Sequence, residues 1–283
     1  VYTAQVKEMN AAAEKSEAKF AVMFNQRTDC VYRKMREIIA AGGIGRLQRV
    51  TWIITDWYRS QFYYDTGSWR ATWAGEGGGV LINQCPHQLD LIGWVVGQMP
   101  KKVRGFCHYG KWHDIEVEDD VTAYLQFANG ATGVFVTTTG DAPGTNRFEV
   151  TGTLGKLVCE NDKLTFWKLA QDEREFCRTA TEGFAQPQCQ QVEVETDGEN
   201  LQHVGVLNAF AGKILHGTPL VAEGTEGLGG LTLSNAMHLS SWLGRAVDIP
   251  FDEELFLSEL NKRRATSRKK ESKDITFSTE GTY

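Results

Sequence analysis

The stretch GEGGGVLINQCPHQLDLIGWVVG, residues 75–97, holds the side chains best suited to chemistry. Asn83 and His87 stand four residues apart, so a helical or nearly helical turn would bring them together. His87 can move a proton near neutral pH, and the glycines upstream would let backbone approach a ligand closely. We therefore predict a catalytic His87 with Asn83 beside it. The alternative is a core histidine with a satisfied hydrogen bond, and Asp90 is expected to pair or cap locally.

A second cluster, DWYRSQFYYDTGSWRATW at residues 56–73, interleaves aromatic side chains with arginines. Aromatic rings with polar tips beside arginine suit sugars and other polyhydroxylated or planar ligands. We expect substrate contacts from three residues of this cluster: Trp57, Tyr58 and Arg59. His203 is expected to be a further substrate contact. An interface loop is the alternative, while the net charge of −6 disfavours a nucleic-acid stacking surface.

The motif FNQR, residues 24–27, follows an apolar segment, KFAVMF, that is predicted to be a strand over residues 19–24. A continuous apolar run of this kind is typical of a parallel strand buried on both faces. In open α/β sheets, ligands bind beyond the carboxyl ends of the strands. Asn25 and Arg27 are therefore predicted to contact a ligand, and an ordinary loop is the alternative.

Hydrophobic periodicity predicts an α+β fold: a large, mainly antiparallel open sheet with helices on one face. A long strand is expected from about residue 46, and six more follow between residues 101 and 169 as a meander, with Asn129-Gly130 joining two of them. One further strand is expected at residues 190–196. Helices are expected at residues 3–16 (capped by Thr3), 29–41, 86–96, 200–216 and 226–246.

Composition limits the classes of function. The chain has 283 residues, of which 41% are hydrophobic and 23% charged, as in globular proteins. The six cysteines form no C-x-x-C pair, which argues against a zinc ribbon or a redox motif. His108 and His113 give only a weak metal signal, so no metal is expected. No apolar run approaches the roughly 18 residues of a membrane helix, and we expect reduced thiols in the cytoplasm. The basic residues from Lys262 to Lys270 are expected to form a solvated arm.

The sequence GSWRATWAGEGGGVLINQCPHQLDLIGWVVG resembles the signature region of the glucose–fructose oxidoreductase/inositol dehydrogenase/MocA (Gfo/Idh/MocA) family. The family pattern there is roughly W-R, then G-G-G, then D-x-G-x-H-x-x-D, followed by an apolar helix and glycine. FNQR, GGIGRLQRVTW, VTGTLG and EGLGGLTLSNAMHLSSWLGRAVDIP agree in order and spacing. The resemblance runs from about residue 1 to about residue 250.

The resemblance implies an N-terminal Rossmann domain that binds NAD or NADP and a C-terminal α+β domain that carries the substrate. It implies that His87 accepts a proton from a substrate hydroxyl. Asn83 falls where the family usually has an aspartate, and Cys85 where it usually has glycine. An amide at position 83 cannot supply negative charge, but it can orient the imidazole by a hydrogen bond. The W-R pair adds Trp69 and Arg70 to Asn25 and Arg27 as expected cofactor contacts.

The expected domains are a remnant of the nucleotide-binding domain at residues 1–25, a substrate-binding and oligomerisation domain at 26–250, and a C-terminal helix and tail at 251–283. The family's E-K-P lysine and fingerprint glycines lie outside this sequence. The resemblance predicts an NAD(P)-dependent oxidoreductase acting on the CH–OH group of a sugar, polyol or glycoside, as a homo-dimer or homo-tetramer. The alternative is a non-catalytic binding or oligomerisation module derived from the same family.

Overall fold

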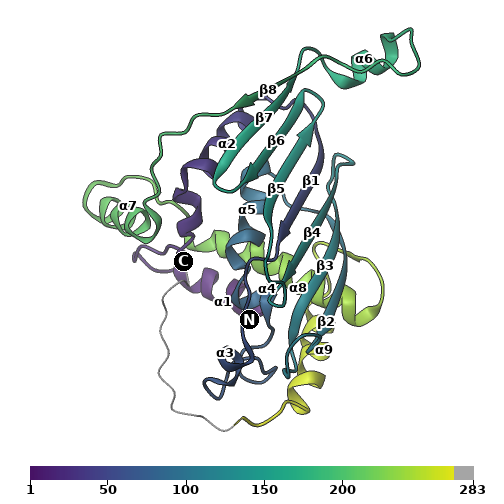
Figure 1. Cartoon of the computed structure of the whole chain (residues 1–283). Coiled ribbons are helices and arrows are strands. Elements are labelled where there is room, and N and C mark those ends of the chain that lie inside the picture. Colours follow the sequence, from purple (N-terminus) through teal and green to yellow (C-terminus); the bar gives the residue numbers. More distant parts are fainter. Residues whose placement is uncertain (271–283) are drawn as a thin grey trace.

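A nine-stranded open sheet dominates the computed structural model, which describes residues 1–270 (Figure 1). The strands are β1 Leu47–Ile54, β2 Lys102–Tyr109, β3 Glu118–Gln126, β4 Thr132–Thr138, β5 Asn146–Gly152, β6 Gly155–Glu160, β7 Lys163–Leu169, β8 Cys189–Glu193 and β9 Val247–Asp248. The helices are α1 Thr3–Glu14, α2 Cys30–Ala40, α3 Gln61–Asp65, α4 Val80–Asn83, α5 Pro86–Val96, α6 Glu173–Thr179, α7 Gln202–His216, α8 Gly227–Leu243 and α9 Glu253–Ala265. Two 3-10 turns, η1 Asn25–Thr28 and η2 Gly224–Glu226, complete the elements.

The strand order is β8-β7-β6-β5-β1-β4-β3-β2-β9, and only β1 and β4 pair in parallel. This confirms the predicted mainly antiparallel α+β fold. The predicted uninterrupted meander is wrong, because β1 lies between β4 and β5. The sequence of β1 suits that central place, since Val50, Trp52 and Ile54 are buried on one face and flanking residues are half-buried on the other.

Helices α2, α5 and α8 cover one face of the sheet (Figure 1). In the core beneath them, the rings of Trp52 and Phe148 stack with centroids 4.1 Å apart. Met35 of α2 and Leu89 of α5 are fully buried in the same core. Burying each large apolar side chain contributes about 1.5–3 kcal/mol, so this layer fixes where α5 and its polar residues lie.

The other face of the sheet is open and carries large apolar side chains. Strand register places Phe106, Tyr124 and Trp167 on this one face, through successive cross-strand pairs from β2 to β7. Their side chains are 49%, 41% and 38% exposed. An open sheet face with several exposed aromatic rings is the kind of surface that marks an interaction site.

The N-terminal segment differs from the prediction in two ways. Residues 19–24 form no strand; Ala21 makes a single isolated bridge with Glu223. Within residues 1–270 the segment pairs with no named strand. Its side chains lie instead against helices, since Phe20 approaches Gly224 of η2 and Val22 approaches Gly227 of α8. The predicted Thr3 cap is also wrong: Tyr2 is the N-cap, and the Thr3 N–H donates to Asn235 Oδ1 of α8 at 3.2 Å. Helix α1 is thereby anchored on α8.

The basic run near the C-terminus is only partly an arm. Lys262, Arg263 and Arg264 belong to α9, and the Arg263 guanidinium lies 4.0 Å from the Trp242 ring centroid. The run is therefore partly a helix-packing surface, as long cationic side chains often are. Residues 271–283 of the predicted tail lie outside the described residues. None of the helices described within residues 1–270 has the length and apolar character to span a membrane.

Candidate active site

A break between α4 and α5 separates the two predicted catalytic residues. Asn83 ends α4, and Pro86 begins α5 at the first helical position, where its missing N–H is no loss. Between them, Cys85 is fully buried, with its Sγ 3.0 Å from Thr137 Oγ1. Burial raises the pKa of the Cys85 thiol to about 12. The thiol is therefore a structural group that fixes the break rather than a nucleophile.

The turn that contains Gly79 packs closely against strand β3 and not against an open ligand site. A Cβ at Gly79 would collide with the carbonyl oxygen of Glu118 in β3. The Glu118 carboxylate accepts hydrogen bonds from the N–H groups of Gly79 at 2.8 Å and Leu81 at 3.1 Å. Its other oxygen lies 2.9 Å from His238 Nε2. The expectation that the glycines admit a ligand is thus wrong at Gly79, where glycine lets the start of α4 pack on a buried carboxylate.

Asn83 belongs to a polar network with the aromatic loop. Its Nδ2 donates to the buried carboxylate of Glu76, and its Oδ1 accepts from the Tyr63 hydroxyl at 3.1 Å. Arg70 donates to that same hydroxyl at 2.5 Å. The expected hydrogen bond from Asn83 to the ring of His87 is not among those formed in the described chain, because the amide is used by these partners. Asn83 is therefore a positioning residue of the loop in this structure.

His87 is the second residue of α5 and is half-buried. Its Nδ1 is buried and has no hydrogen-bond partner in the described chain. The ring lies edge-on to Phe24, with centroids 6.1 Å apart. Burial lowers the pKa of His87 below its usual value, and the nearby charge of His203 lowers it further. A neutral imidazole at pH near 7 can accept a proton, as a general base must.

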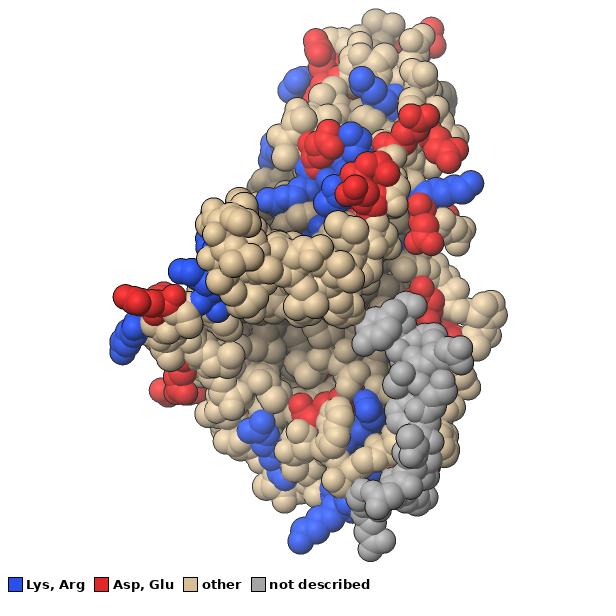
Figure 2. All heavy atoms as spheres, turned by 90° about the vertical axis from the view of Figure 1, so that its left-hand side faces the viewer, with Lys and Arg blue, Asp and Glu red and all other residues tan. Residues whose placement is uncertain are grey.

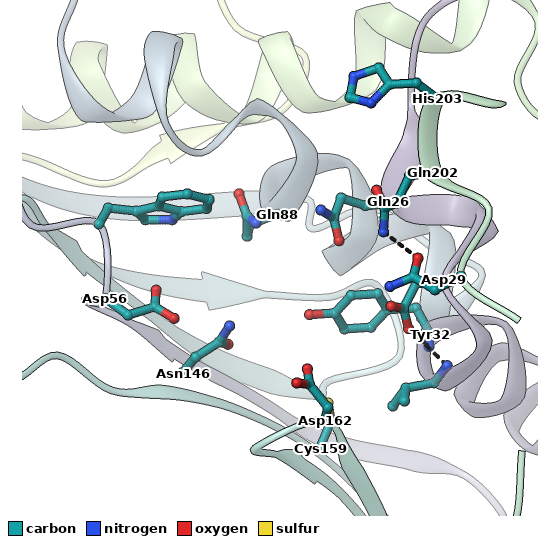
Figure 3. Close-up of a pocket in the computed structure, with 13 residues that line it drawn as sticks. Gln26, Asp29, Tyr32, Asp56, Gln88, Asn146, Cys159, Asp162, Gln202 and His203 are labelled. Atoms are coloured by element: carbon teal, nitrogen blue, oxygen red, sulfur yellow. Dashed lines mark hydrogen bonds between the residues drawn. The ribbon is translucent and has the colours of Figure 1, made fainter. Parts of the chain in front are cut away.

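A cavity of about 460 Å³ lies beside this part of α5, between the ends of β1 and β5 and the segments around η1 and α7 (Figure 3). Two of the predicted substrate contacts, Trp57 and His203, line it, and so does Gln88, the neighbour of His87. The remaining lining residues are Gln26, Asp29, Val31, Tyr32, Asp56, Asn146, Cys159, Asp162, Asn200 and Gln202. A cavity of this size with convergent polar groups is typical of a small-molecule site.

Carboxylates dominate the electrostatics of the cavity. Burial raises the pKa of Asp29, although the Val31 N–H donates to it at 2.8 Å, and the charge of Asp162 adds to the effect. The pKa of Asp56 is raised by the same two causes in the same order. Within residues 1–270, no three His, Cys, Asp or Glu side chains gather in an arrangement that could hold a metal ion.

Arg27 and Asn25, predicted to contact a cofactor, are engaged with the protein. The Arg27 guanidinium is almost fully buried, donates to both Asp90 oxygens at 2.8 Å and donates to Glu226 at 2.6 Å. Burial alone would lower the pKa of Arg27, but these two acidic partners raise it. Asp90 was expected to pair or cap locally. It forms its ion pair instead with Arg27, which is 63 residues away in the sequence. Asn25 donates to Gln202 at 2.5 Å.

The other predicted contacts lie in the aromatic loop. Tyr58 and Trp69 are exposed, and the Arg70 guanidinium lies 4.6 Å from the ring centroid of Trp69. The Arg59 guanidinium lies 5.8 Å from the Trp57 ring centroid and 5.2 Å from that of Tyr63. Arg59 therefore connects the wall of the cavity, through Trp57, to the network around Asn83.

Six of the thirteen buried side-chain N and O atoms that have no hydrogen-bond partner within residues 1–270 belong to the candidate site. Those in the candidate site are Asn25 Oδ1, Trp57 Nε1, Arg59 Nε, Arg70 Nε, His87 Nδ1 and Gln88 Oε1. Leaving such a group unpaired costs about 1–3 kcal/mol. An unpaired buried group calls for an explanation, and a ligand in the cavity would explain those of Trp57 and Gln88, which line it.

Several lining residues were missed from the sequence. Asp56 and Gln88 adjoin predicted residues, so extending each motif by one position would have found them. Asp29 gives a helix-capping signal, and Asn161-Asp162 gives a turn signal with both residues at positive φ. Neither signal says that the side chains face a common cavity, because the pairing of β6 with β5 and β7 decides that.

Comparisons with known proteins agree with this architecture. Residues 32–158 match the family model described as GFO/IDH/MocA C-terminal domain. The chain is 33% identical over 116 residues to the putative oxidoreductase YteT of Bacillus subtilis, covering 38% of this chain and 26% of that protein. It is 29% identical over 198 residues to levoglucosan dehydrogenase of Pseudarthrobacter phenanthrenivorans, covering 59% and 49%.

A solved structure gives the same picture of the fold. The WlbA dehydrogenase of Bordetella pertussis, in complex with NADH and UDP-GlcNAcA, superposes with a TM-score of 0.72 at 23% identity, covering 88% of this chain and 69% of that one. Residues 32–158 are therefore similar to the GFO/IDH/MocA C-terminal domain, and the chain shares the fold of the solved WlbA structure. It spans about half or less of the length of the two curated relatives, 26% and 49%.

Proposed function

We propose that this chain provides the substrate-binding part of an NAD(P)-dependent oxidoreductase that acts on the CH–OH group of a sugar, polyol or glycoside. The main observation is the half-buried His87, whose Nδ1 is unpartnered and whose pKa is lowered by burial and by the charge of His203. His87 is not itself a lining residue of the cavity of about 460 Å³, but its sequence neighbour Gln88 and His203 both line it. The names of family relatives support the substrate class, since one is a levoglucosan dehydrogenase.

In this proposal, each residue has a task that follows from its contacts. His87 accepts the hydroxyl proton, because its neutral ring offers a lone pair inside a partly desolvated site. Trp57, Gln88 and His203 bind hydroxyl groups in the cavity. Asn83 holds the aromatic loop through Tyr63. The Arg27–Asp90 pair fixes α5 against η1, and hence the position of His87.

A bound nicotinamide cofactor would supply hydride transfer. The exposed Trp69 ring with Arg70 over it fits the rim of such a site, because an indole and a guanidinium suit a planar ring and a phosphate. Residues 1–270 contain no strand that runs through G-x-G-x-x-G into a helix, so these residues fit the edge of the cofactor and not its diphosphate. We propose Trp69 and Arg70, rather than Arg27, as this chain's contacts to NAD or NADP.

Turnover by the natural protein that carries this sequence tests the proposal. His87→Ala should lower kcat/KM for oxidation of a sugar or polyol by NAD(P)⁺ by about 10²–10⁴-fold, the usual contribution of a general base. His216→Ala, at the exposed end of α7, is the matched control and should change little. Unchanged kcat/KM in His87→Ala would show that His87 is not the proton acceptor. Absence of turnover with sugars, polyols and glycosides would favour the non-catalytic alternative.

We also propose self-association into a homo-dimer or homo-tetramer through the open face of the sheet, in the cytoplasm. Phe106, Tyr124 and Trp167 share that face with residues of both charges, such as Arg104 and Glu149, so it can complement a second copy of itself. Phe106→Glu should dissociate the assembly in analytical ultracentrifugation. Leu215→Glu, on the exposed side of α7, is the control; dissociation by Leu215→Glu alone would place the interface on α7 instead.

A further inference from the structure

The cavity beside His87 is lined by charges of one sign. Asp29, Asp56 and Asp162 line it, and none of the described lining residues is lysine or arginine. Two other titratable groups, Tyr32 and Cys159, stay neutral near pH 7. Burial raises the pKa of Tyr32 well above its usual value and that of Cys159 to about 12. His203 is the remaining titratable group in the wall.

The charge of Asp162 acts on the other two carboxylates of the cavity wall. After burial, the charge of Asp162 is among the causes that raise the pKa of both Asp29 and Asp56. In Figure 3, Asp56, Asn146 and Asp162 lie along one side of the cavity, with Gln26, Gln88 and His203 above them. A cation placed between the two rows would relieve the repulsion, whereas an anion would add to it.

Gln88 points independently to a ligand. Its side chain lines the cavity and is 4% exposed, yet its Oε1 has no hydrogen-bond partner in the described chain. An amide oxygen accepts hydrogen bonds, so it needs a donor such as a hydroxyl or an ammonium group. The Trp57 Nε1 in the same wall is an unpartnered donor and needs an acceptor oxygen. A ligand that satisfies both walls must carry donors and acceptors.

We propose that the cavity selects a polyhydroxylated ligand bearing a protonated amine, such as an amino sugar or amino polyol, over its neutral and anionic counterparts. This inference rests on the proposed function, because it takes the cavity to be the substrate site. The ammonium group lies among Asp29, Asp56 and Asp162, and the hydroxyl groups bind Gln88 and Trp57. Figure 2 shows the molecule from the side, with charged side chains of both signs above and below a mostly uncharged central band.

Isothermal titration calorimetry of the full chain with three matched probes tests the selection. D-glucosamine, D-glucose and D-glucuronate differ in charge on a common ring, and at about pH 6.5 the amine is mostly protonated, as amines with a pKa near 7.7–8.0 are. We expect D-glucosamine to bind about tenfold tighter than D-glucose, with D-glucuronate weakest. Equal binding of the first two, or tighter binding of D-glucuronate, would overturn the inference, and so would binding of none of the three.

Variants locate the effect in the cavity. Asp162→Asn keeps a residue type that tolerates the positive φ of this position. It should reduce the preference for D-glucosamine over D-glucose by about threefold, the scale of one carboxylate about 6 Å away at water-like screening. Gln88→Met should weaken the binding of all three probes. Asp248→Asn, on the exposed β9 edge of the sheet, is the matched control and should leave the preference unchanged. An unchanged preference in Asp162→Asn would overturn the proposal.

Failure of this inference and failure of the proposed function give different results. Turnover that depends on His87 but shows no preference for amino ligands overturns the inference and keeps the oxidoreductase. A charge-dependent preference for D-glucosamine without any NAD(P)⁺-dependent turnover supports the inference as a binding property and removes the oxidoreductase.

Discussion

Two regions of α5, about one turn apart, differ in whether their buried polar groups have hydrogen-bond partners. Asp90 is almost fully buried, and both of its oxygens accept hydrogen bonds from Arg27. His87 and Gln88 are also withdrawn from solvent, but each has a buried polar atom without a partner. The same helix therefore carries one buried group that is satisfied within the protein and, two or three residues earlier, two groups that are not.

The difference separates scaffold from site. A buried ion pair in which every carboxylate oxygen accepts a hydrogen bond offers no free acceptor to a ligand. Removing one partner of such a pair strongly destabilises the fold. Removing an unpartnered polar atom beside a cavity breaks no hydrogen bond within the protein. The same atom can form a hydrogen bond when a ligand binds. By this criterion Arg27 and Asp90 hold the fold together, whereas His87, Gln88 and Trp57 are the residues that we propose to act on the substrate.

The largest expected contrast is in stability. Asp90→Ala leaves the buried Arg27 guanidinium without its bidentate partner and should lower the free energy of unfolding by about 3–5 kcal/mol. His87→Ala removes an imidazole whose Nδ1 is unpaired, so its effect should stay within about 1 kcal/mol. Urea denaturation of both variants measures the difference. Equal losses in the two variants would break the distinction between the satisfied and the unsatisfied groups of α5.

Asn83→Asp tests why an amide stands where the family usually has a carboxylate. Asn83 donates a hydrogen bond to Glu76, whose pKa is already raised by burial. A carboxylate at position 83 cannot donate and would face a second negative charge. We expect a loss of about 1–2 kcal/mol near pH 8. The loss should shrink as the pH is lowered, because the raised pKa of Glu76 lets this carboxyl take up a proton sooner than a free glutamate and so relieves the repulsion.

The matched control for that charge change is Asn208→Asp on the exposed surface of α7, which should be neutral at the higher and at the lowered pH. If Asn83→Asp is as stable as the parent protein at the higher pH, the hydrogen bond to Glu76 does not explain the amide.

The smallest expected effect concerns the thiol between α4 and α5. Cys85 is fully buried and its pKa is raised to about 12 by burial, whereas Cys177 and Cys189 are exposed. Iodoacetamide under native conditions should label the two exposed thiols and leave Cys85 unmodified, as read by peptide mass spectrometry. Rapid labelling of Cys85 would show that the break beside His87 opens in solution.

Much of the fold could be predicted because local patterns determine it. Pro86 marked the start of α5, Asn129-Gly130 marked the turn between β3 and β4, and alternating apolar residues marked the strands. The place of β1 between β4 and β5 could not be read, because it depends on long-range pairing. The segment at residues 19–24 was misread for the same reason: an apolar run does not reveal whether a neighbouring strand exists to pair with it.

The candidate site shows a similar division. Types and spacing led to His87, Trp57 and His203, which lie in or beside one region of the fold. They did not indicate that Arg27 would form an ion pair with Asp90, since the two residues are 63 positions apart in the sequence. Three carboxylates of the cavity wall come from three separate turns, and only the folded sheet brings them together.

The pH dependence of kcat/KM tests most directly the claim that His87 is the proton acceptor. Burial and His203 lower the pKa of His87, so the ring stays neutral and competent until the pH falls below about 6.5. We expect kcat/KM of the natural protein to be level above that value and to fall at lower pH, with an apparent pKa below about 6.5. In His87→Ala the residual rate should lose this acid limb. An acid limb that persists unchanged in His87→Ala would contradict the assignment.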